Sequence, residues 1–311
     1  MTTAIPIIDI APFRQSGSGA VVEAVGTAAR ERGFFIVTGH GVDPGVTGLL
    51  YRLARAFFDL PAAEKQQLLG GPQQPGGVGF APLGAEALAA TTGQATPGDL
   101  KQSLNYGPRL PGSLWPPAPE GLFGAFDAYF REMENLALLL RQIFCAAIGL
   151  PGDHFERDFV DHLSALRVID YPAQREAPLP GQLRAGAHTD YGFMTILRSE
   201  ATPGGLQVQD RDGGWIDAPA VDDGFVINIA DAFMRWTNDA WVSTPHRVVN
   251  PPREAGGAAR RQSIPFFVNP SAATMIACLP PFVGPGRPAK YPPISYAEYI
   301  ALKTSQAFTS A

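Results

Sequence analysis

The sequence has 311 residues, of which 45% are hydrophobic and 17% are charged, and its formal net charge is −5. This balance is enough for a sizeable buried core in one large or two ordinary domains, and it excludes a wholly disordered chain. The acidic net charge excludes a protein that binds nucleic acid through a broad basic surface, so we expect no nucleic-acid partner.

Membrane and secreted classes are also disfavoured. The longest apolar stretch, residues 136–150, is interrupted by Arg141, and no segment reaches the about 18–20 apolar residues of a membrane span. The N-terminal residues have no basic region and include Asp9, unlike a secretory signal. Only Cys145 and Cys278 are available for a disulfide, and they are far apart. We therefore expect a cytoplasmic protein without a membrane partner, either a monomer or a weak homodimer.

The first part of the chain is predicted to alternate short strands with helices. Apolar residues recur at helical spacing over 21–32. Asp43 followed by Pro44 combines an N-cap with a proline at the first helical position, which predicts a helix that runs to Phe58. The other elements expected here are strands over 5–10 and 34–38 and a second helix start at 60–61.

Two loops and one long helix are predicted next. Glycine and proline dominate 70–82, without a phosphate-binding glycine motif, and proline dominates 108–119. Apolar residues then recur every three or four positions over 122–148, and Gly149 and Pro151 end the pattern. This periodicity predicts a helix that packs against the core.

Beyond about residue 160 the pattern changes to short strands separated by turns. Such spacing predicts a β-sandwich or jelly roll, followed by a last helix over 295–302. The fold class expected is therefore mixed α/β (α+β), with a helical N-terminal half packed around a C-terminal β-core. The strands expected are 165–171, 194–197, 206–208, 215–216, 225–229, 246–249, 263–268 and 275–277.

Three residues suggest a metal site. His188 and Asp190 are two positions apart, so on an extended segment both side chains would reach one ion. His246 opens a predicted strand further along the chain. Two histidines and one carboxylate on one side of a metal form the facial triad of non-haem Fe(II) oxygenases. On spacing alone, a hydrogen-bonded turn and a packed core histidine explain these residues equally well.

A second pair of residues suits an organic acid. Arg261 and Ser263 are also two positions apart on a predicted strand, and a guanidinium beside a hydroxyl matches a terminal carboxylate. Tyr171, at the end of another strand, could add a phenolic hydrogen bond. Arg167 shares the face of Tyr171, although an ordinary salt bridge is the simpler expectation for it, and Arg260 is expected to face solvent.

Further motifs occur in both halves of the chain, and with them the chain resembles the isopenicillin N synthase-like family of Fe(II)/2-oxoglutarate-dependent oxygenases over nearly its whole length. The N-terminal motifs are IPIIDI (5–10), RGFFIVTGHGV (32–42), FFDLPAAEK (57–65) and DLKQSLNYG (99–107). The C-terminal motifs are DYP (170–172), HTDYG (188–192), GGLQV (204–208), WTND (236–239), STPHRVVNP (243–251) and RQSIPFFVNP (261–270).

The resemblance implies a site and a reaction. His188, Asp190 and His246 would bind Fe(II), while Arg261 and Ser263, with Tyr171, would hold the distal carboxylate of the co-substrate 2-oxoglutarate. The enzyme would use O2 to hydroxylate or desaturate a small organic substrate, with release of succinate and CO2. The β-core would be a double-stranded β-helix over 161–270, between an N-terminal helical and strand region (1–160) and a C-terminal strand and helix (271–311).

Residues near these motifs are candidates for the substrate pocket: Tyr191, Phe193, Asn228, Asp231 and Phe267. Two positions depart from the family. Phe193 replaces the small or hydroxylated residue usual after HTDYG, and Ala230 replaces the glycine usual before Asp231. Both are expected near the pocket. His40 lies in a turn, and a structural role is expected for it.

Three other functions remain open at this stage. The family's namesake uses the same triad without 2-oxoglutarate, and its substrate carboxylate takes the Arg-Ser site. Another branch converts 2-oxoglutarate into ethylene and succinate. Outside the enzyme class, the β-core would serve as a sensor that binds a small acid without turnover. The sequence does not identify the primary substrate, because family members act on very different molecules.

Overall fold

The computed structural model describes residues 4–67, 79–107 and 119–308. The predicted loops over 70–82 and 108–119 lie largely outside these residues. Within the described part of the chain, no helix is both long and apolar enough to cross a lipid bilayer.

The first helices begin where the local sequence predicts. The Asp43 carboxylate accepts a hydrogen bond from the Gly45 N–H at 2.7 Å, and Pro44 occupies the first turn of the helix that follows. The short helix α1 was not expected from the sequence. The elements of this part are β1 (Ile7–Asp9), α1 (Ala11–Ser16), α2 (Gly19–Glu31), β2 (Phe34–Thr38), α3 (Pro44–Phe58) and α4 (Ala62–Gln66).

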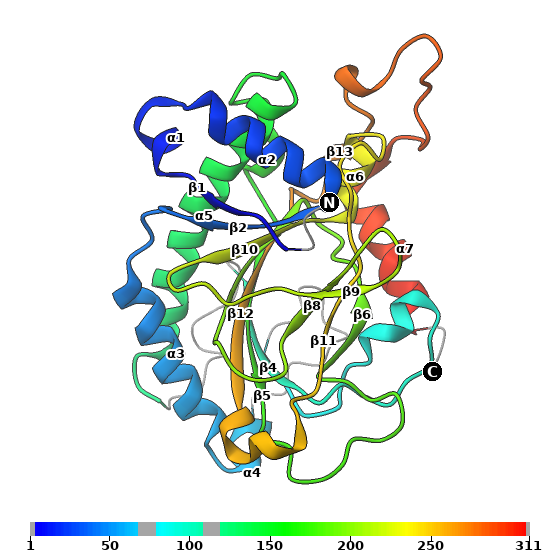
Figure 1. The fold of residues 1–311 in the computed structure, drawn as a ribbon. Coiled ribbons are helices and arrows are strands. Elements are labelled where there is room, and N and C mark those ends of the chain that lie inside the picture. Colours follow the sequence, from blue (N-terminus) through cyan, green and yellow to red (C-terminus); the bar gives the residue numbers. More distant parts are fainter. Residues whose placement is uncertain (1–3, 68–78, 108–118, 309–311) are drawn as a thin grey trace.

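The long predicted helix is α5 (Leu122–Ala147), whose apolar face is almost completely buried. Helix α5 packs against α2 and α3, and the three helices cover one face of the sheet described next (Figure 1). The other helices are α6 (Asp231–Trp236) and α7 (Tyr296–Phe308), with 3₁₀ turns η1 (Leu88–Thr92), η3 (Arg157–Phe159), η4 (Arg253–Ala259) and η5 (Pro280–Phe282).

Two facing sheets form the jelly-roll core, which confirms the predicted fold class. The larger sheet has the order β1-β2-β10-β7-β12-β5-β4-β3, so the N-terminal region supplies strands at both of its edges. Its further strands are β3 (Gly79–Ala81), β4 (Gln102–Tyr106), β5 (Ala165–Tyr171), β7 (Met194–Ser199), β10 (Phe225–Ile229) and β12 (Arg261–Val268).

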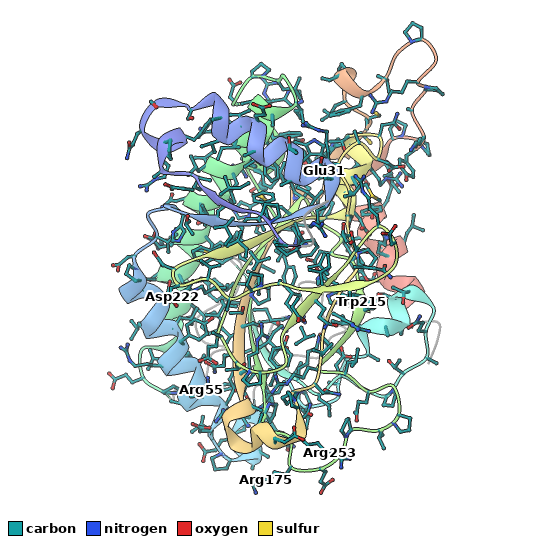
Figure 2. All side chains as sticks on the ribbon, in the orientation of Figure 1. Glu31, Arg55, Arg175, Trp215, Asp222 and Arg253 are labelled. Atoms are coloured by element: carbon teal, nitrogen blue, oxygen red, sulfur yellow. The ribbon has the colours of Figure 1, made fainter. Side chains whose placement is uncertain are left out.

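The smaller sheet has the order β6-β11-β8-β9 and lies on the side of the larger sheet away from α3 and α5 (Figure 1). The side chains of Glu31, Arg175, Asp222 and Arg253 lie at the periphery (Figure 2). Its strands are β6 (Ala185–His188), β8 (Leu206–Gln209), β9 (Trp215–Asp217) and β11 (His246–Val248), and a separate pair is β13 (Met275–Ile276) with β14 (Ile294–Ser295).

Phe193 lies at the centre of an aromatic cluster in the hydrophobic core. Its side chain is fully buried, and its ring centroid is 4.3 Å from that of Phe233 and 5.2 Å from that of Phe155. Ala230, also fully buried, donates its N–H to the Phe193 carbonyl. The expectation that these two residues lie at the pocket is therefore wrong for the ring of Phe193, which packs core helices onto the sheet.

This packing predicts a large effect on stability. Phe193→Ala should lower the free energy of unfolding by about 3–5 kcal/mol, because it leaves a cavity among rings that cannot close over it. Phe193→Leu retains most of the apolar volume, so it should lower the free energy of unfolding by a smaller amount. Urea denaturation of both variants measures the difference, and a loss below about 1 kcal/mol in the alanine variant would contradict the packing role.

Candidate active site

A cavity of about 660 Å³ lies between the two sheets, beneath η1 and α7. Most of its lining is apolar, from residues such as Leu206 and Val248 of the smaller sheet and Pro265 of the larger one. His188, Asp190 and His246 line the same cavity as Arg261 and Ser263, so the structure brings together the two groups of residues that the sequence singles out.

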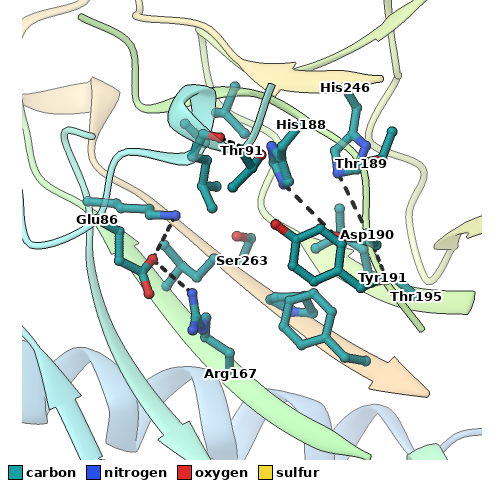
Figure 3. Close-up of a pocket in the computed structure, with 18 of the residues that line it drawn as sticks. Glu86, Thr91, Arg167, His188, Thr189, Asp190, Tyr191, Thr195, His246 and Ser263 are labelled. Carbon is teal, nitrogen blue, oxygen red and sulfur yellow. Dashed lines mark hydrogen bonds and ion pairs between the residues drawn. The ribbon is translucent and has the colours of Figure 1, made fainter. Parts of the chain in front are cut away.

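Strand pairing places the two histidines beside each other. His188 is the last residue of β6, and His246, the first residue of β11, is its direct cross-strand partner. Their ring centroids are 4.3 Å apart. Asp190 follows in the loop after β6, with its oxygens 4.0 Å from Nε2 of His188 and 3.8 Å from Nε2 of His246 (Figure 3). One ligand atom from each of the three residues lies within 4.8 Å of the other two.

Hydrogen bonds orient all three side chains, and for His246 the partner of Nδ1 is the Thr244 carbonyl at 3.3 Å. Nδ1 of His188 donates to the Gly186 carbonyl at 2.8 Å, which leaves the lone pair of Nε2 directed at the centre of the triad. Oδ2 of Asp190 accepts from the Thr195 hydroxyl at 2.6 Å and from the Asn228 amide at 2.7 Å. These neighbours hold the carboxylate in place before any ion is bound.

The electrostatics of the triad favour metal binding. Burial, with the neighbouring His246, lowers the pKa of His188 to about 3, so its imidazole is neutral at pH 7. Burial raises the pKa of Asp190, but His246 and His188 and the two side-chain hydrogen bonds outweigh burial and hold it below its ordinary value. A neutral imidazole and an ionised carboxylate are the ligand forms that a divalent cation requires.

The donor set fits Fe(II). Two imidazoles and one carboxylate are the donor set of non-haem Fe(II) oxygenases, and all three residues that would hold the ion line the cavity. The cation would also balance the buried negative charge of Asp190.

A buried arginine without a partner marks the other part of the site. Arg261 is 2% exposed, and its Nη1 forms no hydrogen bond with any described residue. Its guanidinium carbon lies 5.2 Å from the ring centroid of Tyr171, the residue opposite Arg261 in the β12–β5 register. Because an unsatisfied buried cation is costly, the geometry calls for an anionic acceptor in the cavity beside Arg261 and Ser263.

Arg184 is a second buried arginine that the sequence did not reveal. It is fully buried, donates to the carbonyls of Pro203, Gly204 and Ala259, and lies with its guanidinium carbon 5.7 Å from the Tyr171 ring. Burial, together with the like charge of Arg261, lowers its pKa to about 10, so it stays protonated at pH 7. Arg184 therefore adds positive potential beside Arg261.

The predicted pocket residues separate into two groups. Tyr191, Asn228 and Phe267 line the cavity, although the Asn228 amide is engaged with Asp190. Phe193 lies in the core, and Asp231 is 4% exposed outside the cavity lining, where it bonds α7 through Lys303 at 2.6 Å. These two residues are not part of the cavity lining, although Tyr191 and Gly192, which precede Phe193, are.

Several other predictions concern residues around the site. His40 has the structural role expected, since Nε2 lies 2.6 Å from the Asp223 carbonyl oxygen. Arg260 is partly exposed and pairs with Asp59 and Asp170. Arg167 forms the expected salt bridge, to Glu86, but it also lines the cavity.

Among the cavity residues that the sequence analysis did not single out are three polar ones, Glu86, Lys101 and Asn105. The available signal was the motif over 99–107, which contains both Lys101 and Asn105. Their positions become clear only from the pairing of β4 with β5, in which Asn105 is opposite Arg167.

Comparisons with known proteins agree with this geometry. Residues 5–121 match the family model described as non-haem dioxygenase in morphine synthesis N-terminal, and residues 161–270 match that of the 2OG-Fe(II) oxygenase superfamily. A 2-oxoglutarate-Fe(II) type oxidoreductase of Aspergillus fumigatus is 32% identical, over 95% of this chain and 91% of the relative.

Solved structures show the same fold with ligands. A full-length Neurospora crassa protein in complex with alpha-KG (2-oxoglutarate) and thymine has a TM-score of 0.84 at 29% identity, covering 98% of this chain and 97% of that one. The protein JOX2, in complex with 2OG, Fe and JA, has a TM-score of 0.80 at 26% identity, covering 96% and 84%. With the triad of His188, Asp190 and His246 binding Fe(II), the chain belongs to the isopenicillin N synthase-like family of the 2OG-Fe(II) oxygenase superfamily.

Proposed function

We propose that this Fe(II)/2-oxoglutarate-dependent oxygenase hydroxylates or desaturates a small organic substrate, and that Arg261, Ser263 and Tyr171 hold its 2-oxoglutarate. The observation that carries the assignment is the Nη1 atom of Arg261, buried in the same cavity as the triad and without a partner among the described residues. A carboxylate at this position would accept from Arg261 and from the Ser263 hydroxyl, with the charge of Arg184 behind them.

When bound, iron and 2-oxoglutarate supply the oxidising chemistry: O2 and 2-oxoglutarate are consumed, succinate and CO2 are released, and a substrate C–H bond is oxidised. The residues of the chain provide geometry. Thr195 and Asn228 fix the carboxylate of Asp190, and the carbonyl of Gly186 fixes the ring of His188. The apolar lining excludes water from the bound substrate.

Of the substrate residues predicted from the sequence, we expect those that line the cavity to act on the substrate. Tyr191 and Phe267 would pack against the substrate, while Asn228 would act through Asp190. The cavity of about 660 Å³ holds a small molecule together with 2-oxoglutarate. The relatives solved with thymine and with JA also take small organic molecules.

We also propose that the protein acts in the cytoplasm, as a monomer or a weak homodimer. Two cysteines without a disulfide, Cys145 and Cys278, suit the reducing cytoplasm. Large exposed apolar side chains, such as Ile7, Val160 and Leu179, come from separate elements, which suits a monomer or a weak homodimer. The regions 1–160, 161–270 and 271–311 would act as one catalytic unit.

Anaerobic titration tests the reaction class. Adding 2-oxoglutarate to the Fe(II)-loaded full chain should produce a visible charge-transfer band, and exposure to air should then produce succinate. A band without succinate would contradict turnover, and absence of a band would contradict use of 2-oxoglutarate. Gas analysis detects ethylene, which would replace hydroxylation or desaturation as the outcome.

Loss of either histidine ligand should abolish activity. His188→Ala and His246→Ala each remove one of the two nitrogen ligands, so stoichiometric iron binding and succinate formation should both fall to the level of an enzyme-free control. His40→Ala, which changes a histidine outside the cavity, should retain iron. Iron content by elemental analysis and succinate by chromatography give the result, and wild-type turnover in either ligand variant would overturn the triad.

Loss of Arg261 should weaken the binding of 2-oxoglutarate. Arg261→Leu removes a charged hydrogen-bond donor worth about 1.5–3 kcal/mol, so the Kd for 2-oxoglutarate should rise about ten- to hundredfold while iron binding is kept. Arg260→Leu is the matched control, because the adjacent Arg260 pairs with Asp59 and Asp170 instead. The titration described above measures both variants, and equal affinities would refute the assignment.

A further inference from the structure

Four polar side chains of the cavity lining contact one another, and two of them, Glu86 and Arg167, lie away from the metal ligands (Figure 3). We refer to Glu86, Lys101, Asn105 and Arg167 as the polar wall. Oε2 of Glu86 lies 3.0 Å from Lys101 Nζ and accepts from Nη1 of Arg167 at 2.9 Å. Nε of Arg167 donates to Oδ1 of Asn105 at 2.6 Å. The polar wall is therefore a connected network rather than a set of independent charges.

The charges of the polar wall are already balanced. Burial raises the pKa of Glu86, but Arg167 and Lys101 outweigh burial and hold it at about 2, so the carboxylate is ionised. Asp99, which is 1% exposed and lies 3.5 Å from Lys101 Nζ, supplies a second carboxylate. Two cations thus face two acids. A substrate carboxylate would find no positive charge to spare, and a substrate ammonium would find no spare negative charge.

One acceptor and two donor groups of the polar wall have no hydrogen-bond partner among the described residues. Within the described residues, Oε1 of Glu86, Nη2 of Arg167 and Nδ2 of Asn105 form no hydrogen bond, although all three residues line the cavity. The acceptor is on Glu86, and the donor on Arg167 belongs to its ion-pair partner. Glu86 and Arg167 form one ion pair through Oε2 and Nη1, so the free atoms Oε1 and Nη2 belong to two adjacent side chains. A ligand that satisfies both must present a donor next to an acceptor and carry no net charge.

An aromatic ring flanks the polar wall. The Phe267 ring centroid lies 6.0 Å from the guanidinium carbon of Arg167, and Pro265 and Tyr191 line the cavity nearby. Flat surfaces of this kind favour a planar group. An amide has both properties, since its N–H and its C=O lie in one plane.

We infer that the cavity selects a substrate with an uncharged amide-type head group, such as a lactam, an imide or a ureide, whose N–H donates to Glu86 and whose carbonyl accepts from Arg167. This assignment rests on the proposed function, because the head group would anchor the substrate while its apolar remainder faces the Fe(II) site. Asn105 and Lys101 hold the two anchoring side chains in position.

Matched aromatic probes test the inference on the wild-type protein. Benzamide, benzoate, benzylamine and benzyl alcohol share one ring and differ only in the polar group. Each is titrated into the anaerobic Fe(II)–2-oxoglutarate complex, in which 2-oxoglutarate already occupies the Arg261 site, with the visible band and calorimetry as readouts. Benzamide should bind about tenfold or more tightly than each of the others. Benzoate and protonated benzylamine each bring a charge that one side of the ion pair opposes, and benzyl alcohol has a single oxygen that must serve both wall residues, whereas an amide offers a separate donor and acceptor.

Replacing Glu86 should shift the preference from the amide probe towards the carboxylate probe. Glu86→Gln removes the negative charge that repels an anion, so benzoate should gain at least about tenfold in affinity relative to benzamide. Glu134→Gln is the matched control, because Glu134 pairs with His162 outside the cavity lining and its removal should leave the ratio unchanged. If Glu86→Gln does not fold, the probe series on the wild-type protein still decides the matter.

Every other outcome counts against the inference. Tightest binding of benzoate would make the polar wall an anion site, tightest binding of benzylamine a cation site, and equal binding of benzyl alcohol a hydroxyl site. Absence of binding by all four probes would likewise overturn it. Failure of the proposed function is recognised separately, because the 2-oxoglutarate band and succinate would then be missing before any probe is added.

Discussion

The whole site depends on the pairing of β6 with β11. This short antiparallel contact places His188 directly opposite His246, and the ladder irregularity between His246 and Val248 follows at once. Within the smaller sheet, β6 pairs with β11 alone, whereas β11 pairs with β6 and β8. The larger sheet supports Asp190 through hydrogen bonds from Thr195 and Asn228. The metal ligands are therefore held by backbone hydrogen bonds and by two packed sheets rather than by mobile loops alone.

Charge is arranged differently in the two parts of the cavity. Beside the β12–β5 pair, Arg261 and Arg184 leave positive potential without a protein carboxylate hydrogen-bonded to either guanidinium among the described residues, so that region suits an anion. At the polar wall, each cation already has an acidic neighbour, Glu86 or Asp99. This difference in charge distinguishes a site for the co-substrate from a site for the substrate within the same cavity.

Local patterns predicted most elements, and pairing across the sheet explains what they missed. The cap at Asp43 and the periodicity of α5 are local signals, and both helices were predicted nearly to the residue. Strand β6 consists of Ala-Gly-Ala-His, which lacks the branched and aromatic residues that mark a strand, so it was not predicted. The triad was recognisable from its motifs. The polar wall was not, because Glu86 reaches it only through tertiary contacts, and the core position of Phe193 depends on helix packing that its own neighbours in sequence do not encode.

His188 and His246 are far apart along the chain, so binding of Fe(II) between them is coupled to folding. An unfolded chain keeps these imidazoles apart, so a high-affinity ferrous site exists only where the smaller sheet has formed. By mass action, the metal then stabilises the native state in proportion to the logarithm of its free concentration. Chelation of the iron would consequently lower the thermal midpoint of this protein.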